Sequence, residues 1–166
     1  LDSFGGAIQE AVVEKRKVAL VSHRSAPKIA SRQRELLGDL KKRCPTKFFH
    51  VPVWVHNSEN TRARDFNQRS RSFLFAALAA VVARIFGLWG IRFYENGVVS
   101  VNLPIASQVV GGRATRTTHP QALNGFSDIF TALFQRPFAV ENPFLWATKA
   151  EVVRSIRDAG CGDLIR

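Results

Sequence analysis

The sequence of 166 residues contains no methionine and only two cysteines. Cys44 and Cys161 are far apart and lack the close spacing of metal ligands, so a disulfide-rich or cysteine-rich metal scaffold is excluded. We expect two buried or free thiols, as is usual in a reducing cytoplasm. The absence of an initiator before Leu1 and the abrupt end at Arg166 indicate an excerpt of a longer protein, with processing as the alternative.

Acidic residues are also scarce. The chain has 13 Asp and Glu residues and 24 Lys and Arg residues, which gives a net charge of +11. Such a surplus favours acidic partners, and the guanidinium fork of arginine suits phosphate in particular. A basic surface that only keeps the protein in solution explains the charge equally well.

Long apolar runs are missing too. The most apolar stretch, 73–89, is interrupted by Arg84 and Gly87 and is too short for a membrane span, so we expect a buried helix there. No signal peptide is recognisable, and we expect a cytoplasmic protein without a membrane partner. Hydrophobic residues make up 46% of the chain, enough for a core, which argues against disorder.

Short apolar runs alternate with amphipathic segments along the chain. Strands are predicted at 17–22, 48–55 and 91–95, a short strand or extended link at 138–140, and helices at 4–14, 27–43, 69–86, 120–134 and 148–160. Pro52 puts the second strand at an edge or a bulge. The alternation predicts one α/β domain over residues 1–166, with three α/β/α layers around a mainly parallel sheet.

Ligands of such sheets bind beyond the carboxyl ends of the strands. The loops of interest are therefore 22–24, 56–71, 95–116 and 141–149.

The start of the first helix, Leu1-Asp2-Ser3, offers backbone N–H groups and a hydroxyl to an anion, although Ser3 acting as a structural cap is the simpler interpretation. Before the long helix, four arginines could contact phosphate or nucleic acid, or could only be solvated; they are Arg62, Arg64, Arg69 and Arg71.

The segment 111–119 combines two glycines with Arg113, Arg116 and three threonines, a composition that favours an oxyanion site over a plain turn. His119 is interpreted as the residue that precedes a helix start. Thr148 is interpreted as an N-cap, with Glu151 completing a capping box. Lys149 lies against an unfavourable helix dipole, so an anion holds it there or its side chain is exposed.

Glu95 is the only acidic residue at the end of an apolar strand. Its carboxylate could accept two hydrogen bonds from a guanine-like edge or ligate magnesium, and a solvated turn residue is the alternative. His23 could line an adenine pocket, but a structural histidine with satisfied ring nitrogens is favoured. The sequence has no Ser/His/Asp triad, no paired-histidine metal signature and no Walker A loop.

Three motifs together resemble those of the PP-loop ATP pyrophosphatases, and of the 7-cyano-7-deazaguanine synthases in particular. Leu1-Asp2-Ser3 matches the tail of their Ser-Gly-Gly-x-Asp-Ser loop, with the glycines and the first strand missing before residue 1. Arg71-Ser72-Phe73-Leu74-Phe75 is similar to their Arg-Asn-x-x-Phe-Leu-Ser, and Ala147-Thr148-Lys149-Ala150-Glu151-Val152 to their Leu-Thr-Lys-x-Glu-Ile. The middle, with its segments 93–104 and 111–120, looks more like the synthase-like component of Qat-type antiphage systems.

This resemblance implies an adenine nucleotide alpha hydrolase-like (Rossmann-like) fold and an ATP-dependent carbon–nitrogen ligase. A carboxylate on a 7-deazaguanine would be adenylated, pyrophosphate would leave, and ammonia or, in a relative from antiphage defence, an amine on a protein partner would displace AMP. The alternative is a nucleotide-binding or nucleic-acid-binding module without catalysis.

The resemblance also implies the site residues. The catalytic set is Asp2, Arg71 and Lys149; the ATP-binding set is Leu1, Asp2, Ser3, His23, Arg113, Arg116 and Lys149; and the substrate set is Arg69, Glu95 and Asn96. Asp2 would help to hold Mg²⁺. Zinc is expected only in the complete protein, beyond residue 166.

Overall fold

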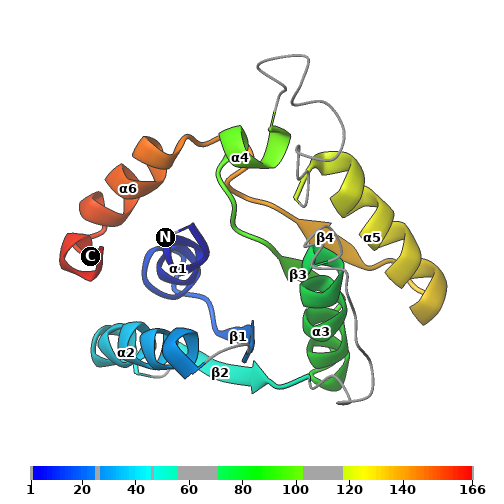
Figure 1. The fold of residues 1–166 in the computed structure, drawn as a ribbon, viewed down its shortest axis with the longest axis horizontal. Helices are drawn as coiled ribbons and strands as arrows, with labels where there is room; N and C mark the ends of the chain where they lie inside the picture. The colour runs from blue at the N-terminus through cyan, green and yellow to red at the C-terminus, as the bar shows by residue number, and fades with distance from the viewer. Residues whose placement is uncertain (1, 25–26, 46, 56–70, 103–117, 166) are drawn as a thin grey trace.

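The structure is a computed structural model that describes residues 2–24, 27–45, 47–55, 71–102 and 118–165 (Figure 1). In chain order its elements are α1 (Asp2–Ile8), the π-helical turn η1 (Gln9–Val13), β1 (Val18–His23), α2 (Pro27–Arg43), β2 (Phe48–Val53), α3 (Arg71–Ile85), β3 (Gly90–Arg92), α4 (Gly97–Val101), α5 (Pro120–Phe134), β4 (Ala139–Glu141), α6 (Lys149–Asp158) and the 3-10 turn η4 (Gly162–Leu164).

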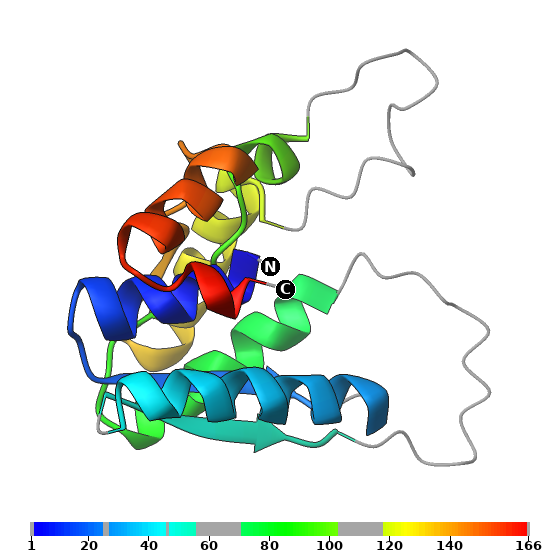
Figure 2. The same ribbon diagram turned by 90° about the vertical axis from the view of Figure 1, so that its left-hand side faces the viewer.

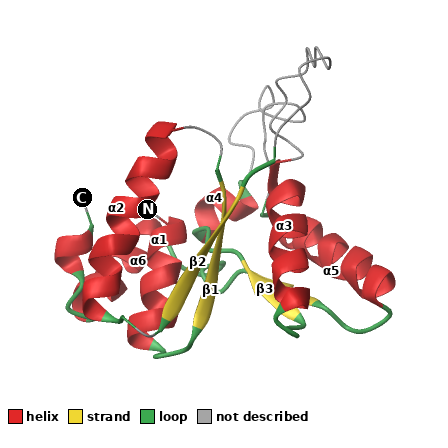
Figure 3. Ribbon diagram, turned by 90° about the horizontal axis from the view of Figure 1, so that it is seen from below, coloured by secondary structure: helices red, strands yellow, loops and turns green. Residues whose placement is uncertain are grey.

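The described strands form two parallel pairs. Strand β1 pairs with β2, with Val18 opposite Phe48, and β3 pairs with β4, with Gly90 opposite Ala139. Figure 3 shows β3 set apart from the β1–β2 pair and close to α3. The predicted mixture of helices and parallel strands is confirmed. In the described part of the chain, however, the strands make two separate sheets, where one continuous sheet was predicted.

Each strand pair belongs to its own hydrophobic core. The first core lies between α1, α2 and α6, and its most buried side chains are Ile8, Leu40, Val152, Ile156 and Cys161. The second lies between α3, α5 and β4, and its most buried side chains are Ala76, Ala80, Phe130, Phe138 and Leu123. The small alanines let α3 pack closely against its neighbours. Figure 1 shows the two groups of helices on either side of the molecule.

Helix α1 connects the two halves by running antiparallel to β3 and the segment after it. Asp2 accepts a hydrogen bond from Asn96 at 2.8 Å, Gly6 lies against the ring of Tyr94, and Glu10 forms an ion pair with Arg92 at 2.8 Å. Along these three contacts the residue numbers rise in α1 and fall in the segment from β3 to Asn96, so the two run in opposite directions. Figure 2 shows α1 between α6 and the β1–β2 pair.

Several local predictions are confirmed. Helices α2 and α5 have the predicted bounds of 27–43 and 120–134, and each begins with a proline at its first position. The capping box of Thr148 and Glu151 is present at the start of α6. Strand β2 pairs only with β1 in the described part of the chain, in keeping with the edge position predicted from Pro52.

Other local predictions were wrong. Ser3 is not a helix cap, because α1 already begins at Asp2. The turn predicted at 95–97 leads into a short helix, α4, which Asn96 caps by accepting a hydrogen bond from the backbone N–H of Val99 at 3.2 Å.

None of the helices in the described segments has both the length and the apolar character needed to cross a membrane. The apolar helix expected over 69–86 is α3, which ends at Ile85.

We predict that Gly6→Ala weakens the fold. A Cβ at Gly6 would overlap the ring of Tyr94 and force α1 away from the segment after β3. We expect the free energy of unfolding to fall by about 1–3 kcal/mol, the usual cost of an overpacked contact, in urea titrations followed by circular dichroism. The matched control is Gly125→Ala, because a Cβ at Gly125 in α5 meets no atom within 4 Å. Equal stability of the two variants would contradict this role of Gly6.

Candidate functional site

Four of the predicted residues converge where α1, α4 and α6 begin. They are Asp2, Glu95, Asn96 and Lys149. Asn96 is the residue that ties the group together, since its Nδ2 donates to Asp2 Oδ2 at 2.8 Å while its Oδ1 caps α4. Both side chains are buried: Asn96 is 2% exposed and Asp2 is 8% exposed.

The backbone of Glu95 is fixed by Asn142, which follows β4. Asn142 Nδ2 donates to the carbonyl of Glu95 at 2.8 Å, and its Oδ1 accepts from the N–H of Glu95 at 3.2 Å. Asn142 Nδ2 also donates to Ser100 Oγ at 2.9 Å, which connects it to α4. The backbone of Glu95, which follows β3, is therefore held by a residue that follows β4.

The carboxyl groups of Asp2 and Glu95 are close enough to affect each other's protonation. Burial and the neighbouring carboxyl of Asp2 raise the pKa of Glu95 to about 7. Burial alone would also raise the pKa of Asp2, but interactions with Asn96 and Glu95 and the charge of Lys149 outweigh it and lower that pKa. Near neutral pH the raised pKa therefore lets Glu95 carry a proton beside the ionised Asp2.

One oxygen of this pair has no donor. Asp2 Oδ1 is buried and accepts no hydrogen bond from the described residues. A buried carboxylate oxygen without a partner is costly, so the site favours a proton on Glu95, an N–H from a ligand, or a hard cation.

The pair also fits the predicted magnesium. Mg²⁺ is usually held by one or two carboxylates, with waters and substrate phosphates as its other ligands. The described ranges contain no cluster of three or more His, Cys, Asp or Glu side chains that could hold a metal. Asp2 would therefore supply a protein oxygen ligand in this region, and a substrate would have to supply others.

Lys149 has neighbours that differ from those expected. It is exposed in the first turn of α6, and the anionic groups acting on it are the carboxyls of Asp2 and Glu95. The two carboxyls offset the unfavourable interaction between the charge of Lys149 and the helix dipole. A bound anion was one of the two explanations predicted from the sequence.

A second group of predicted residues lines one cavity of about 870 Å³. It comprises Ser3, His23 and Arg71, which come from α1, β1 and α3. The guanidinium of Arg71 lies 5.2 Å from the ring centroid of Phe75, and the ring of His23 lies 6.2 Å from it. His23 Nε2 is buried and has no hydrogen-bond partner in the described part of the chain, so the favoured interpretation of a satisfied structural histidine was wrong.

The remaining predicted residues cannot be placed. Leu1, Arg69, Arg113 and Arg116 lie outside the described residues, as do Arg62 and Arg64. His119 caps α5, with its Nδ1 accepting a hydrogen bond from the N–H of Gln121 at 3.2 Å, which agrees with its interpretation as a residue at a helix start.

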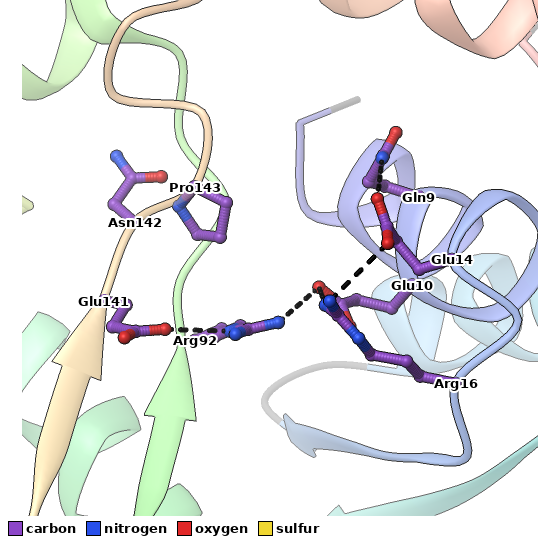
Figure 4. A pocket seen from close by; sticks show the side chains of 8 residues that line it. All are labelled: Gln9, Glu10, Glu14, Arg16, Arg92, Glu141, Asn142 and Pro143. Atoms are coloured by element: carbon purple, nitrogen blue, oxygen red, sulfur yellow. Dashed lines mark hydrogen bonds and ion pairs between the residues drawn. The ribbon is translucent and has the colours of Figure 1, made fainter.

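Sequence analysis missed an ionic network centred on Glu10 (Figure 4). The carboxylate of Glu10 accepts hydrogen bonds from Arg16 at 3.1 Å, from Arg92 at 2.8 Å and from the hydroxyl of Tyr94, and Arg92 also donates to Glu141 at 2.9 Å. Burial opposes ionisation of Glu10, but these donors lower its pKa. No local pattern could reveal the network, because Arg92 and Glu141 are far from Glu10 in the sequence.

No family model matches this chain, and no curated protein matches it in sequence. The motif resemblance therefore stays a prediction.

We predict that Glu95 makes stability depend on pH. Its folded pKa of about 7 exceeds the ordinary value of 4.5, so the folded state binds the proton more tightly and the free energy of unfolding falls as the pH rises from about 5 to 8. Because the group is partly solvated, we expect a loss of roughly 1 kcal/mol. Glu95→Gln, which mimics the neutral carboxyl, should remove this slope in urea titrations at pH 5 and pH 8. An identical slope in the variant would show that Glu95 does not titrate in this way.

Proposed function

We propose that the chain carries the nucleotide and substrate site of an ATP-dependent carbon–nitrogen ligase that adenylates a 7-deazaguanine carboxylate. The observation that carries the proposal is the convergence of Asp2, the neighbours Glu95 and Asn96, and Lys149, which come from three separate parts of the sequence. A second support is that Ser3, His23 and Arg71 line one cavity.

In the proposed reaction a substrate carboxylate oxygen bonds to the α-phosphorus of ATP, and the bond from that phosphorus to the β-phosphate oxygen breaks. Pyrophosphate leaves with the electron pair, and an amine then replaces AMP at the carboxyl carbon. Magnesium would supply positive charge to the phosphates. Catalysis of this kind depends on holding the reactants in line and balancing charge.

Asp2 and Lys149 are suited to binding the charged groups of this reaction, a cation and a phosphate. Asp2 stays ionised because its pKa is lowered, and its unpaired Oδ1 can serve as a cation ligand. Lys149 is exposed and can turn from the two carboxyls toward a phosphate. Arg71, which lines the cavity, would add a second positive charge.

Glu95 suits recognition of the base. A 7-deazaguanine presents an N–H and an amino group side by side, and a carboxylate accepts both. With its pKa of about 7, Glu95 is ready to give up its proton when such donors arrive. The nearby Asn96 is occupied by Asp2 and the α4 cap, so it positions Asp2.

We predict that Asp2→Asn lowers the rate of pyrophosphate release by at least about 100-fold, the usual loss when a charged group of a catalytic site is neutralised. The assay uses the complete protein with Mg²⁺, ATP and 7-carboxy-7-deazaguanine, with ammonia or an amine as acceptor. Glu95→Gln should mainly raise KM for the deazaguanine, because it loses one acceptor for the base while the phosphates are untouched.

The control is Asp158→Asn, which removes an exposed carboxylate at the far end of α6 and should leave the rate unchanged. Absence of pyrophosphate release by the unchanged protein with every acceptor would refute the enzymatic proposal.

A net charge of +11 favours a second candidate, a nucleic-acid-binding module without catalysis. Binding that neutralises six or more phosphates should weaken by about 1000-fold or more between 50 and 200 mM salt, because counterions are released on binding. Fluorescence anisotropy with a labelled RNA or DNA measures this. Steep salt dependence without pyrophosphate release would support the binding module over the ligase.

A further inference from the structure

Large apolar side chains are exposed along the outer side of helices α3 and α5. Val81 and Ile85 of α3 are four residues apart, as are Ile129 and Leu133 of α5, so each pair lies on one face of its helix. We call these four side chains the outer patch. Ile85 is 73% exposed and Leu133 is 68% exposed. Single exposed apolar residues are ordinary, but several gathered on one surface indicate a place where another molecule binds.

The two pairs belong to one surface because α3 and α5 pack side by side (Figure 3). Near the start of α3, the ring centroid of Phe73 lies 5.6 Å from that of Phe126 in α5. Near the ends of both helices, the guanidinium of Arg84 lies 5.6 Å from the ring centroid of Phe134. The helices therefore run in the same direction and share one seam.

Helical periodicity places the outer patch on the solvent side of this seam. Successive residues turn by about 100° around a helix. In α3 the side chains that face the second core are Ala76 and Ala80, so the two patch residues of this helix point away from that core. In α5 the hydroxyl of Ser127 accepts a hydrogen bond from the N–H of Val140 at 3.0 Å, so the two patch residues of α5 point away from β4.

Two arginines are held at one end of the outer patch. The guanidinium of Arg84 lies 3.5 Å from the ring centroid of Trp89, and that of Arg136 lies 4.2 Å from it, so one indole holds both cations. Arg84 directly precedes Ile85, and Arg136 follows Leu133 by three residues. Neither arginine forms an ion pair with any residue that the structure describes, and each therefore has donors left for a carboxylate.

This combination of apolar and cationic groups selects the chemistry of a partner. Nucleic acid would meet the arginines with its phosphates but would leave the outer patch without apolar contacts. A second copy of the chain would carry the same charge of +11, and its α3 and α5 together contain a single carboxylate, Asp128. An acidic amphipathic helix offers both apolar side chains and carboxylates, which the guanidinium forks bind well.

We propose that the outer patch, together with Arg84 and Arg136, is a docking surface for an acidic amphipathic helix of a protein partner. The apolar side chains of such a helix recur every three or four residues and pack along the seam. Helix α3 has 15 residues, so a partner helix of about four turns spans the surface. No residue of the docking surface lines the cavity of about 870 Å³, and the proposal holds whether or not the ligase activity is correct.

The test measures the binding of a labelled helical peptide to the 166-residue chain by fluorescence anisotropy in about 150 mM salt. The peptide has about 16 residues, with leucines on one face and glutamates on the other. A scrambled peptide of the same composition controls for the general attraction between an acidic peptide and a basic protein. A peptide with lysines in place of the glutamates controls for apolar contact alone. We expect the acidic amphipathic peptide to bind at least about ten-fold more tightly than either control.

Variants of the chain locate the binding. Ile85→Glu and Leu133→Glu place a repelling charge in the outer patch, at exposed positions where glutamate suits a helix, and each should weaken binding at least about ten-fold. Arg136→Gln should weaken it about two- to five-fold, as expected for one exposed ion pair. The matched control is Trp146→Glu, an equal change of charge at a side chain that is 91% exposed between β4 and α6, and it should leave the affinity unchanged.

Circular dichroism checks that each variant keeps its helices, and Ile85→Gln or Leu133→Gln replaces a glutamate variant that does not fold. Equal affinity for the amphipathic and the scrambled acidic peptides would overturn the proposal, because charge alone would then explain the binding. Affinity that both patch variants leave unchanged would also overturn it. So would self-association in analytical ultracentrifugation, or attachment to phosphatidylserine vesicles, that Leu133→Glu abolishes, since a second copy or a membrane would then cover the outer patch.

Discussion

The contact between α1 and the segment from β3 to α4 determines how the rest of the structure fits together. One end of it is a buried hydrogen bond between Asn96 and Asp2, and the other is the ion pair of Glu10 with Arg92. Between them Gly6 allows the ring of Tyr94 to lie directly on the helix. Because α1 also contributes Ile8 to the first core, this contact fixes one half of the molecule against the other.

Local signals were sufficient for the elements that carry their own start signals. Pro27 and Pro120 occupy the first turns of α2 and α5, and Thr148 with Glu151 caps α6, so their positions could be predicted. Helix α4 could not. Its sequence, Gly-Val-Val-Ser-Val, is rich in β-branched residues, and its helical form depends on the Asn96 cap and on close packing of Gly97 against the carbonyl of Leu145. Such a contact between distant segments leaves no periodic pattern.

The candidate site was predictable to a similar extent. Asp2, Glu95 and Lys149 each stand at the end or start of an element, and an α/β fold brings such positions to one edge. What the sequence could not show was the balance of charge among them. The two carboxyls share one region, so Lys149 has protein anions beside it and Glu95 has a pKa of about 7. Asn142, which holds the backbone of Glu95, is 47 residues away along the chain and has no motif of its own.

The carboxyl pair and the cavity are coupled through the first residues of α1. Asp2 belongs to the pair, and Ser3, the next residue, lines the cavity. Because the two residues are consecutive in α1, a shift of that helix moves both, so the contact of α1 with the segment after β3 sets the geometry of the carboxyl pair and of one cavity wall together.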